Sequence, residues 1–368
     1  MRDGDVVVIG GGYAGVRLAK RLDEAARVTL VDRKEVFFHR VASLRAGVRP
    51  DWSVTPFIPY DRLLRDGRVV VGKAVRIDTT ARQVVLATGE RLPYDVVVIA
   101  TGADYPEPAR FAGTTTEETI KSLAGHQSRV AAAEHVLVVG GGPSGVELSA
   151  EIRLARPDAR VTLAHAGKAL LHSTGSERAG RKALAWLEAH DVDVRLDTFM
   201  TPGNDFDTYR DARGNVIEAD LSFWATGTTP NTLWLRLAGH GDWLNAAGHV
   251  RVDRRLRVGG RPDVFAVGDV NDATELKITP TALAQADLAA HNIRLRLQNP
   301  GRHRKEPLLY RPTQRTPVIV PFGSADGLTV LPVPGGESAV LGGRTTALAK
   351  AKTLMTPYMR RQLGYTAT

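Results

Sequence analysis

Two short glycine-rich segments have the residue types and spacing most suggestive of chemistry. Residues 10–15 read GGGYAG and residues 140–145 read GGGPSG, so both contain the spacing G-x-G-x-x-G. In such a loop the first glycine makes a tight turn, the second lets the backbone approach a pyrophosphate, and the third lets a helix pack closely on a strand. The pyrophosphate then lies at the positive N-terminus of that helix. The segments predict two dinucleotide sites, with candidate residues Gly10, Gly11, Gly12, Tyr13, Ala14 and Gly15 in the first and Gly140, Gly142 and Gly145 in the second.

Each glycine segment stands between elements that could position it. The continuous apolar runs 6–9 and 136–139 come directly before the glycines, as expected of strands buried on both faces of a parallel sheet. Apolar residues at helical spacing follow the glycines, and a second buried run follows each helix, over 28–31 and 161–164. This order of strand, glycine turn, helix and strand predicts an α/β fold with two Rossmann-like units.

The residue that follows the second strand differs between the two units. In the first unit it is Asp32, about twenty residues after the glycines, where a carboxylate can accept hydrogen bonds from an adenosine ribose. In the second unit it is His165, followed by Lys168, and no carboxylate is available for a ribose 2′-hydroxyl. We therefore expect His165 to tolerate or bind a 2′-phosphate, which favours NADPH or the use of both nicotinamide cofactors. The alternative is that His165 is an ordinary loop residue.

Three further strand-like segments end in residues that suit a site between the two units. Segments 94–102 and 221–227 each end in Ala-Thr-Gly, and we interpret them as the passages of the chain from one unit to the other. Their candidate site residues are Thr101, Gly102 and Gly227. Segment 263–269 ends in Gly268 and Asp269, and the Asp269 carboxylate could accept hydrogen bonds from the ribityl hydroxyls of a flavin. A helix N-cap is the alternative role for Asp269.

The composition excludes several classes of function. The chain has 368 residues, which suggests two or three domains, and it contains no cysteine. Disulfides, Cys-ligated zinc, iron–sulfur clusters and redox-active dithiols are therefore excluded, and the chemistry expected here needs no metal. No apolar run approaches the ~18–20 residues that a membrane-spanning helix needs. We expect a cytoplasmic protein, either freely dissolved or peripherally attached to a membrane.

Taken together, these motifs resemble the flavoprotein superfamily of glutathione-reductase architecture over nearly the whole chain. Within it, the sequence is most similar to the apoptosis-inducing-factor-like and ferroptosis-suppressor-like NAD(P)H:quinone oxidoreductases, and more distantly to type II NADH dehydrogenases. The resemblance implies FAD in the first site and NAD(P)H in the second. It also implies an FAD-binding domain over 1–105 and 228–300, an NAD(P)H-binding domain over 106–227, and a small α+β domain over 301–368 at the acceptor site or an interface.

The resemblance also implies roles for individual residues. The stretch 31–45 looks like the subgroup's loop toward the flavin, so Arg45 would contact FAD, as would the backbone near Ala74. Lys277, eight residues after Asp269, would lie near the flavin ring and stabilise the anion formed on hydride uptake, aided by the helix N-terminus at Thr281. Glu147 would help to seat the nicotinamide. The alternatives are an exposed loop lysine for Lys277 and a first-turn acid favoured by the helix dipole for Glu147.

The C-terminal stretch is strongly basic. Residues 302–368 hold ten Lys or Arg and three acids, while the whole chain has a formal charge of +9. Segments 318–321 and 328–331 are typical of hairpin strands, and 347–363 of a basic amphipathic helix interrupted at Pro357. Such a helix could contact an anionic membrane, or it could dock on its own core or on a partner subunit.

The function expected from these observations is hydride transfer from NAD(P)H to FAD, followed by electron transfer to a small acceptor, most simply a quinone. A ferredoxin- or rubredoxin-type reductase and a monodehydroascorbate-type reductase remain alternatives, as does a redox-gated nucleic-acid-binding flavoprotein, although no specific nucleic acid is expected as a partner. The missing cysteines exclude disulfide reductases. The sequence is compatible with a monomer or a homodimer.

Overall fold

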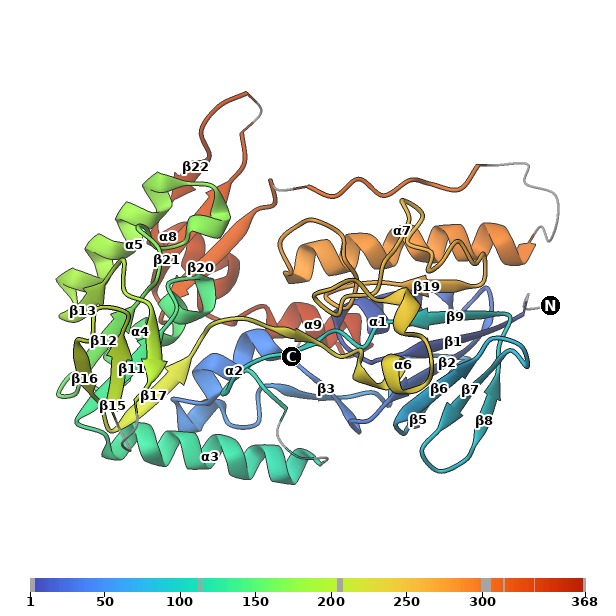
Figure 1. Cartoon of the computed structure of the whole chain (residues 1–368), viewed down its shortest axis with the longest axis horizontal. Helices are drawn as coiled ribbons and strands as arrows, with labels where there is room; N and C mark the ends of the chain where they lie inside the picture. The colour runs from blue at the N-terminus through green and yellow to red at the C-terminus, as the bar shows by residue number, and fades with distance from the viewer. Residues whose placement is uncertain are drawn as a thin grey trace.

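The N-terminal part of the chain is built on a five-stranded parallel sheet with the order β19-β9-β1-β2-β5. The computed structural model describes residues 4–111, 113, 115–203, 208–298, 306–313, 315–333 and 335–366. The strands are β1 (Asp5–Ile9), β2 (Arg27–Asp32), β5 (Arg68–Val71), β9 (Val96–Ile99) and β19 (Val264–Ala266). Because β19 comes from much later in the chain, two separated stretches of sequence build this sheet (Figure 1).

Both faces of this sheet are buried, which explains the unbroken apolar runs in its strands. Val6 and Val8 belong to a core cluster that includes residues of the helices α1 (Tyr13–Leu22) and α7 (Thr279–Gln298). Val7 and Ile9 point to the opposite face, because side chains alternate along a strand. That face packs on the antiparallel sheet of β6 (Ala74–Asp78), β7 (Gln83–Leu86) and β8 (Arg91–Pro93), and on the segment with α6 (Leu233–Leu237) and η3 (Gly241–Trp243).

A second parallel sheet repeats this plan in the order β13-β12-β11-β17. Its strands are β11 (His135–Val139), β12 (Arg160–Ala164), β13 (Val192–Arg195) and β17 (Leu221–Trp224). One face packs on the helices α3 (Thr116–Ala132), α4 (Pro143–Ala155) and α5 (Glu177–Ala189). The other face packs on the antiparallel sheet of β14 (Met200–Pro202), β15 (Thr208–Asp211) and β16 (Val216–Glu218). The α/β fold with two Rossmann-like sheets is thus confirmed.

The two sheets are joined by paired connections. The short strands β10 (Ala103–Asp104) and β18 (Thr229–Pro230) run antiparallel to each other, and each follows one of the Ala-Thr-Gly segments. A separate excursion of the chain between β2 and β5 of the first sheet contains β3 (Val36–Phe38), α2 (Arg40–Ala46), η1 (Pro50–Trp52) and β4 (Phe57–Pro59), and its helix α2 contacts α4. Figure 1 shows α2 between the lobes that hold the two sheets.

The C-terminal stretch packs on both lobes. A three-stranded antiparallel sheet, β20 (Val318–Phe322), β21 (Asp326–Leu331) and β22 (Ala339–Leu341), contributes to the core of the second lobe. The final helix α9 (Thr356–Gln362) lies against the first lobe, where Met359 and Leu363 join the core around α1. Lys20 of α1 also donates a 2.7 Å hydrogen bond to the backbone oxygen of Gln362. For α9, docking on the protein's own core is therefore the observed arrangement.

The break in the basic C-terminal helix lies earlier than the sequence indicated. The expected interruption was at Pro357, but Leu354 and Met355 already adopt left-handed backbone angles, and Pro357 lies in the first turn of the new helix α9. A proline suits a first turn, because its missing N–H would have no partner there, and it disfavours helical geometry in the residue before it. Before the break the chain forms α8 (Gly343–Thr346) and a π-helical turn, η4 (Ala347–Ala351).

Among the described residues, none of the helices is long and apolar enough to span a membrane. In the same part of the chain, no group of three or more His, Cys, Asp or Glu side chains is arranged to hold a metal ion.

Replacing Leu363 by alanine should destabilise the protein by about 2–5 kcal/mol, because its side chain is fully buried and the substitution leaves a cavity. Leu348→Ala is the matched control: Leu348 is 89% exposed on η4, so the change should stay within about 0.5 kcal/mol. Denaturant unfolding of the two variants measures both values. Equal stabilities would mean that α9 is not held against α1 in solution.

Candidate functional site: two nucleotide cradles

The first glycine loop turns directly from β1 into α1 and brings their backbones into contact. Gly10 has a φ of +111°, a backbone conformation that side chains rarely adopt, and a Cβ there would overlap the carbonyl of Ala100. A Cβ on Gly15 would overlap the carbonyl oxygen of Gly10. Glycine at these two positions is what allows the N-terminus of α1 to lie against the end of the strand.

The second glycine loop is built in the same way. Gly140 has a φ of +119°, a Cβ there would lie 2.6 Å from the carbonyl oxygen of Ala225, and a Cβ on Gly145 would overlap the oxygen of Gly140. Each contact has its counterpart in the first loop. The two loops are therefore equivalent in conformation as well as in sequence.

Both loops face open space where a phosphate would lie. A Cβ on Gly12 or Gly142 would meet no atom within 4 Å, although each glycine is the residue that precedes the first turn of its helix. An open face at a helix N-terminus suits an anion, because the backbone N–H groups there have no partner within the helix. The geometry thus fits a dinucleotide pyrophosphate at each loop, and a side chain at Gly12 or Gly142 would fill that space.

Asp32 lies next to the first loop, as its position after β2 predicts. It is buried, and one carboxylate oxygen accepts a hydrogen bond from the N–H of Gly11. The other oxygen accepts from Lys34, both from its backbone N–H at 2.8 Å and from its Nζ at 2.6 Å. Sequence reasoning missed Lys34, whose only signal is its place two residues after Asp32.

His165 takes the corresponding place beside the second loop. The N–H of Gly141 donates to His165 Nδ1 over 3.1 Å, as the N–H of Gly11 does to Asp32. Burial lowers the pKa of His165, while a backbone contact with Ala169 acts in the opposite direction. The exposed Lys168 lies three residues further along the same loop.

Gly268 and Asp269 lie against the first glycine loop. A Cβ on Gly268 would come within 3.1 Å of the Cβ of Ala14, so the end of β19 meets the start of α1. Asp269 accepts a short hydrogen bond from the hydroxyl of Tyr105, a residue that sequence reasoning missed, and burial raises the pKa of that tyrosine. The guanidinium of Arg40 lies 4.4 Å from the centre of the Tyr105 ring. These contacts hold the Asp269 carboxylate at the junction of the glycine loop and the β10 connection.

Lys277 and Thr281 lie in the segment that leads into α7. The Lys277 ammonium donates to the backbone oxygens of Asn271 at 2.8 Å and Ala273 at 3.1 Å, and burial lowers its pKa. Thr281 is buried and its hydroxyl donates to the oxygens of Leu276 and Ile278. Lys277 is thus tethered within its own loop rather than extended as an exposed side chain, and its role toward the flavin stays a prediction.

The connections between the lobes contain Thr101 and the two glycines that the sequence assigned to the site. Thr101 donates to the oxygen of Asn231 at 2.9 Å, and the Asn231 amide donates back to the oxygen of Thr101 at 3.1 Å. Gly102 and Gly227 both have positive φ angles, and a Cβ on either would meet no atom within 4 Å. Ala74, in contrast, is a buried residue of β6 and contributes to the core of the first lobe.

Arg45 is fully buried in an ion pair that joins separate parts of the chain. Its Nε lies 2.7 Å from Glu151 of α4, its Nη1 donates to the oxygen of Ala351 in η4 at 2.8 Å, and its guanidinium stacks on Trp52 at 4.6 Å. The structure therefore gives this side chain partners within the protein, and a contact with FAD stays a prediction.

Glu147 forms a second buried ion pair close to the first. Its carboxylate lies 2.9 Å from the Nζ of Lys350, which also donates to the oxygen of Ile319. Burial raises the pKa of Glu147, and Lys350 opposes this shift. Glu147 and Glu151 are four residues apart and so lie on one face of α4, toward the C-terminal segment. Sequence analysis counted Lys350 only as a basic residue, because nothing local links it to a residue about two hundred positions earlier.

A chain of hydrogen bonds connects the first glycine loop to the C-terminal segment. The hydroxyl of Tyr13 lies 2.8 Å from Nδ1 of His39, and Nε2 of His39 lies 2.8 Å from the oxygen of Leu354. Burial lowers the pKa of His39 to about 4, so the ring is neutral at pH 7. A neutral ring that donates to a carbonyl through Nε2 must accept from Tyr13 through Nδ1.

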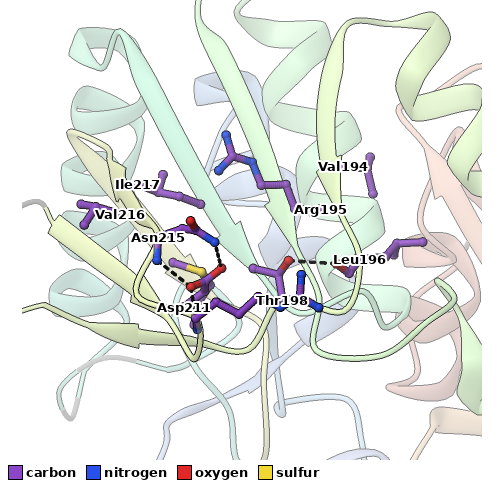
Figure 2. Close-up of a pocket in the computed structure, with 10 residues that line it drawn as sticks. Val194, Arg195, Leu196, Thr198, Asp211, Asn215, Val216 and Ile217 are labelled. Atoms are coloured by element: carbon purple, nitrogen blue, oxygen red, sulfur yellow. Dashed lines mark hydrogen bonds between the residues drawn. The ribbon is translucent and has the colours of Figure 1, made fainter.

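A cavity of about 640 Å³ opens at the carboxyl end of β13, between that strand and the β15–β16 turn. Figure 2 shows Leu196 and Thr198 on one side and the hydrogen-bonded pair Asp211 and Asn215 on the other. The N–H of Thr198 donates to the carbonyl of His165. The cavity therefore lies beside the second nucleotide cradle, by which we mean glycine loop 140–145 with His165; the first cradle is glycine loop 10–15 with Asp32.

Comparison with known proteins agrees with this arrangement. A family model described as pyridine nucleotide-disulphide oxidoreductase matches residues 4–286. The chain belongs to this family. Among curated relatives, apoptosis-inducing factor homolog B of Dictyostelium discoideum is 28% identical, covering 95% of this chain and 94% of its own. Human ferroptosis suppressor protein 1 is 32% identical, covering 78% of this chain and 79% of its own.

Solved structures show the same fold. The sulfide:quinone oxidoreductase of Aquifex aeolicus superposes with a TM-score of 0.78 at 20% identity, covering 98% of this chain and 91% of its own. A ferredoxin reductase from Rhodopseudomonas palustris superposes with a TM-score of 0.69 at 18% identity, covering 90% and 83% of the two chains.

The chain is an FAD-dependent oxidoreductase that uses NAD(P)H. The expected enzyme class, cofactors and family resemblance are therefore confirmed. The family's description names disulphide chemistry, but the sequence contains no cysteine that could supply a thiol for it.

Gly12→Val should weaken FAD retention by about tenfold or more while leaving the apoprotein's stability unchanged, because the added side chain fills only the phosphate space. Gly15→Ala is the contrasting variant and should destabilise the apoprotein itself, since its Cβ overlaps a carbonyl. Flavin content of the purified proteins and unfolding of their apo forms measure the two effects. A fully flavinated Gly12→Val protein would contradict the assignment of the open face to a phosphate.

Arg45→Met should lower the free energy of unfolding by about 3–5 kcal/mol, because it leaves the buried Glu151 carboxylate without its partner. The control is Arg49→Met, which removes an exposed ion pair with Asp51 and should cost less than about 1 kcal/mol. Adding Glu151→Met to the Arg45 variant should restore much of the loss. A double variant no more stable than the single one would argue against the ion pair as the cause.

Proposed function

We propose that this enzyme passes electrons from NAD(P)H, through FAD, to a small quinone. The first cradle, with Asp32 and Asp269, binds FAD, and the second cradle binds the nicotinamide cofactor. When bound, FAD supplies the chemistry of accepting a hydride and of releasing electrons to the acceptor. Lys277 and the N-terminus of α7 supply positive charge beside it.

The single observation that carries the proposal is the buried pair of Glu147 and Lys350. Reduction of a quinone to a hydroquinone takes up two protons as well as two electrons, so an acceptor site needs a proton donor. The Lys350 side chain is 13% exposed and that of Glu147 is 10% exposed, and both lie where α4 meets the C-terminal segment. An ammonium in such a place can hold the acceptor's carbonyl oxygen and donate a proton to it.

Two further points favour a quinone over a disulfide or a protein acceptor. The sequence lacks the cysteines that thiol chemistry needs. Its similarity to the apoptosis-inducing factor homolog B covers 95% of the chain, and the resemblance to quinone oxidoreductases of this type thus includes the C-terminal stretch. The similarly folded Aquifex protein acts, by its description, between sulfide and quinone, which supports a fold suited to that acceptor. Peripheral contact of the basic C-terminal stretch with an anionic membrane would bring the enzyme to a lipid-soluble acceptor.

The acceptor site that we propose lies where four segments meet. Tyr13 at the start of α1, His39 before α2, Glu147 on α4 and Lys350 on η4 supply its polar groups. The Tyr13–His39 hydrogen bond connects the FAD cradle to this junction, and the charge of Lys350 acts to lower the pKa of His39. The backbone also joins the two residues, because Leu354, whose oxygen contacts Nε2 of His39, donates its N–H to the oxygen of Lys350.

Lys350→Met should lower kcat/KM for menadione or ubiquinone-1 by about a hundredfold, because it removes the proposed proton donor. Turnover with ferricyanide, which accepts electrons without a proton, should change little. Lys352→Met is the matched control, since Lys352 is exposed two residues away. Steady-state assays with both acceptors at matched flavin content distinguish the cases.

An equal loss with ferricyanide and quinone would place the effect of Lys350 before the acceptor step and would contradict its proposed role. Turnover with ferricyanide but with no quinone in a panel, even for the unchanged protein, would overturn the quinone proposal itself.

A further inference from the structure

We propose that the second cradle selects NADPH over NADH, and that His165 is the residue that sets this preference. The inference deepens the nicotinamide half of the proposed function and rests on that half alone. It does not depend on which acceptor is reduced.

The first step is that His165 and Asp32 are structural counterparts. In the register of the two sheets, the last residue of β1, Ile9, lies opposite Val31, and the last residue of β11, Val139, lies opposite Ala164. Asp32 and His165 follow directly. Asp32 accepts a hydrogen bond from the N–H of Gly11, and His165 accepts one from the N–H of Gly141. A Cβ on Gly11 would lie 2.8 Å from the Asp32 carboxylate, and a Cβ on Gly141 would lie 2.7 Å from the His165 ring.

The second step is the chemistry of the exchanged group. NADH and NADPH differ only at the adenosine 2′ position, which carries a hydroxyl in NADH and a phosphate in NADPH. A carboxylate at this position accepts hydrogen bonds from the hydroxyl and repels the phosphate. His165 does neither, because its Nδ1 is occupied by the Gly141 N–H and its ring carries no negative charge. The usual advantage of NADH is therefore absent.

The third step is the charge of the surrounding loop. Residues 165–172 contain two histidines and one lysine and no acid. Lys168 is exposed and can reach a phosphate, and a lysine is a common phosphate ligand. On the neighbouring strand, the Arg195 guanidinium is paired with Asp193 at 3.0 Å. The carboxylate of Asp197 is exposed, and its backbone N–H donates to the oxygen of Gly167.

Asp193 is already paired with Arg195, whereas the carboxylate of Asp197 is exposed beside the same loop. Asp197 is therefore the acid that could bind the ribose 2′-hydroxyl in place of a carboxylate at position 165. If Asp197 bound the 2′-hydroxyl, NADH would be favoured despite His165. The positive charge of Lys168, on the loop that follows His165, favours the phosphate instead.

The experiment measures binding to the FAD-loaded protein, with no turnover, by titration calorimetry. The probes are NADP⁺ and NAD⁺, and then 2′,5′-ADP and 5′-AMP, which contain only the adenosine end. We expect the unchanged protein to bind NADP⁺ and 2′,5′-ADP about fivefold or more tightly than their counterparts without the 2′-phosphate. Equal or tighter binding of NAD⁺ and 5′-AMP would overturn the proposal.

Three variants identify the residue responsible. His165→Asp should reverse the preference toward NAD⁺, with a change of about tenfold or more in the ratio of dissociation constants. His165→Asn keeps an acceptor for the Gly141 N–H without a charge, and should keep the preference for NADP⁺. Asp197→Asn should leave the ratio unchanged.

Lys168→Ala decides the outcome if His165→Asp fails to fold. This substitution should weaken the binding of NADP⁺ several-fold, because one contact with the 2′-phosphate is lost, and it should leave the binding of NAD⁺ nearly unchanged. A His165→Asp protein that is folded and yellow but keeps the original ratio would overturn the role of His165. Failure of the quinone proposal would leave all of these binding results intact, so the two failures are distinguishable.

Discussion

The close approach of a helix N-terminus to the end of a strand, repeated in two lobes, is the constraint on which the rest of the structure depends. Gly15 and Gly145 allow it, since any side chain would overlap the carbonyl of the first glycine in each loop. The contact aims the unpartnered N–H groups of α1 and α4 at open space, which is what an anionic pyrophosphate requires. The other candidate residues are arranged around these two points, at strand ends or on the connections between the lobes.

The C-terminal segment joins the two lobes beside the proposed acceptor site. It packs β20 and β21 into the second lobe and α9 into the first, so it cannot move without exposing apolar surface. Between these contacts lie two buried ion pairs, Arg45 with Glu151 and Glu147 with Lys350. Burying four charges is costly unless each is paired, so the pairing defines the positions of α2, α4 and η4 relative to one another. A segment that looks like a basic tail in the sequence thus supplies part of the proposed acceptor site.

Sequence reasoning predicted most of the fold, because its signals are local. The glycine loops, the apolar strands on either side of them and the residues at the strand ends all occur within about thirty residues, the span of one βαβ unit. The hairpin strands β20 and β21 also lie where their residues indicated. Local signals misplaced the break in the C-terminal helix by two to three residues, since a proline marks a helix start as readily as an interruption.

The partners of the site residues could not be predicted in this way. Tyr105 reaches Asp269 across 164 positions, Arg45 reaches Ala351 across 306, and His39 reaches Leu354 across 315. Each pairing depends on how one lobe and the C-terminal segment pack on another. Such packing reflects the whole set of buried surfaces rather than any short pattern.

By itself, the sequence determined that this protein has two nucleotide cradles, an acid in one and a histidine in the other, and no thiol. These features follow from residue type and short-range backbone geometry, which are already present in the chain. Only the tertiary structure decided that Lys350 meets Glu147 and that Arg45 faces inward to meet Glu151. Those contacts exist only once distant segments are buried together, because burial removes the water that would otherwise satisfy each group separately.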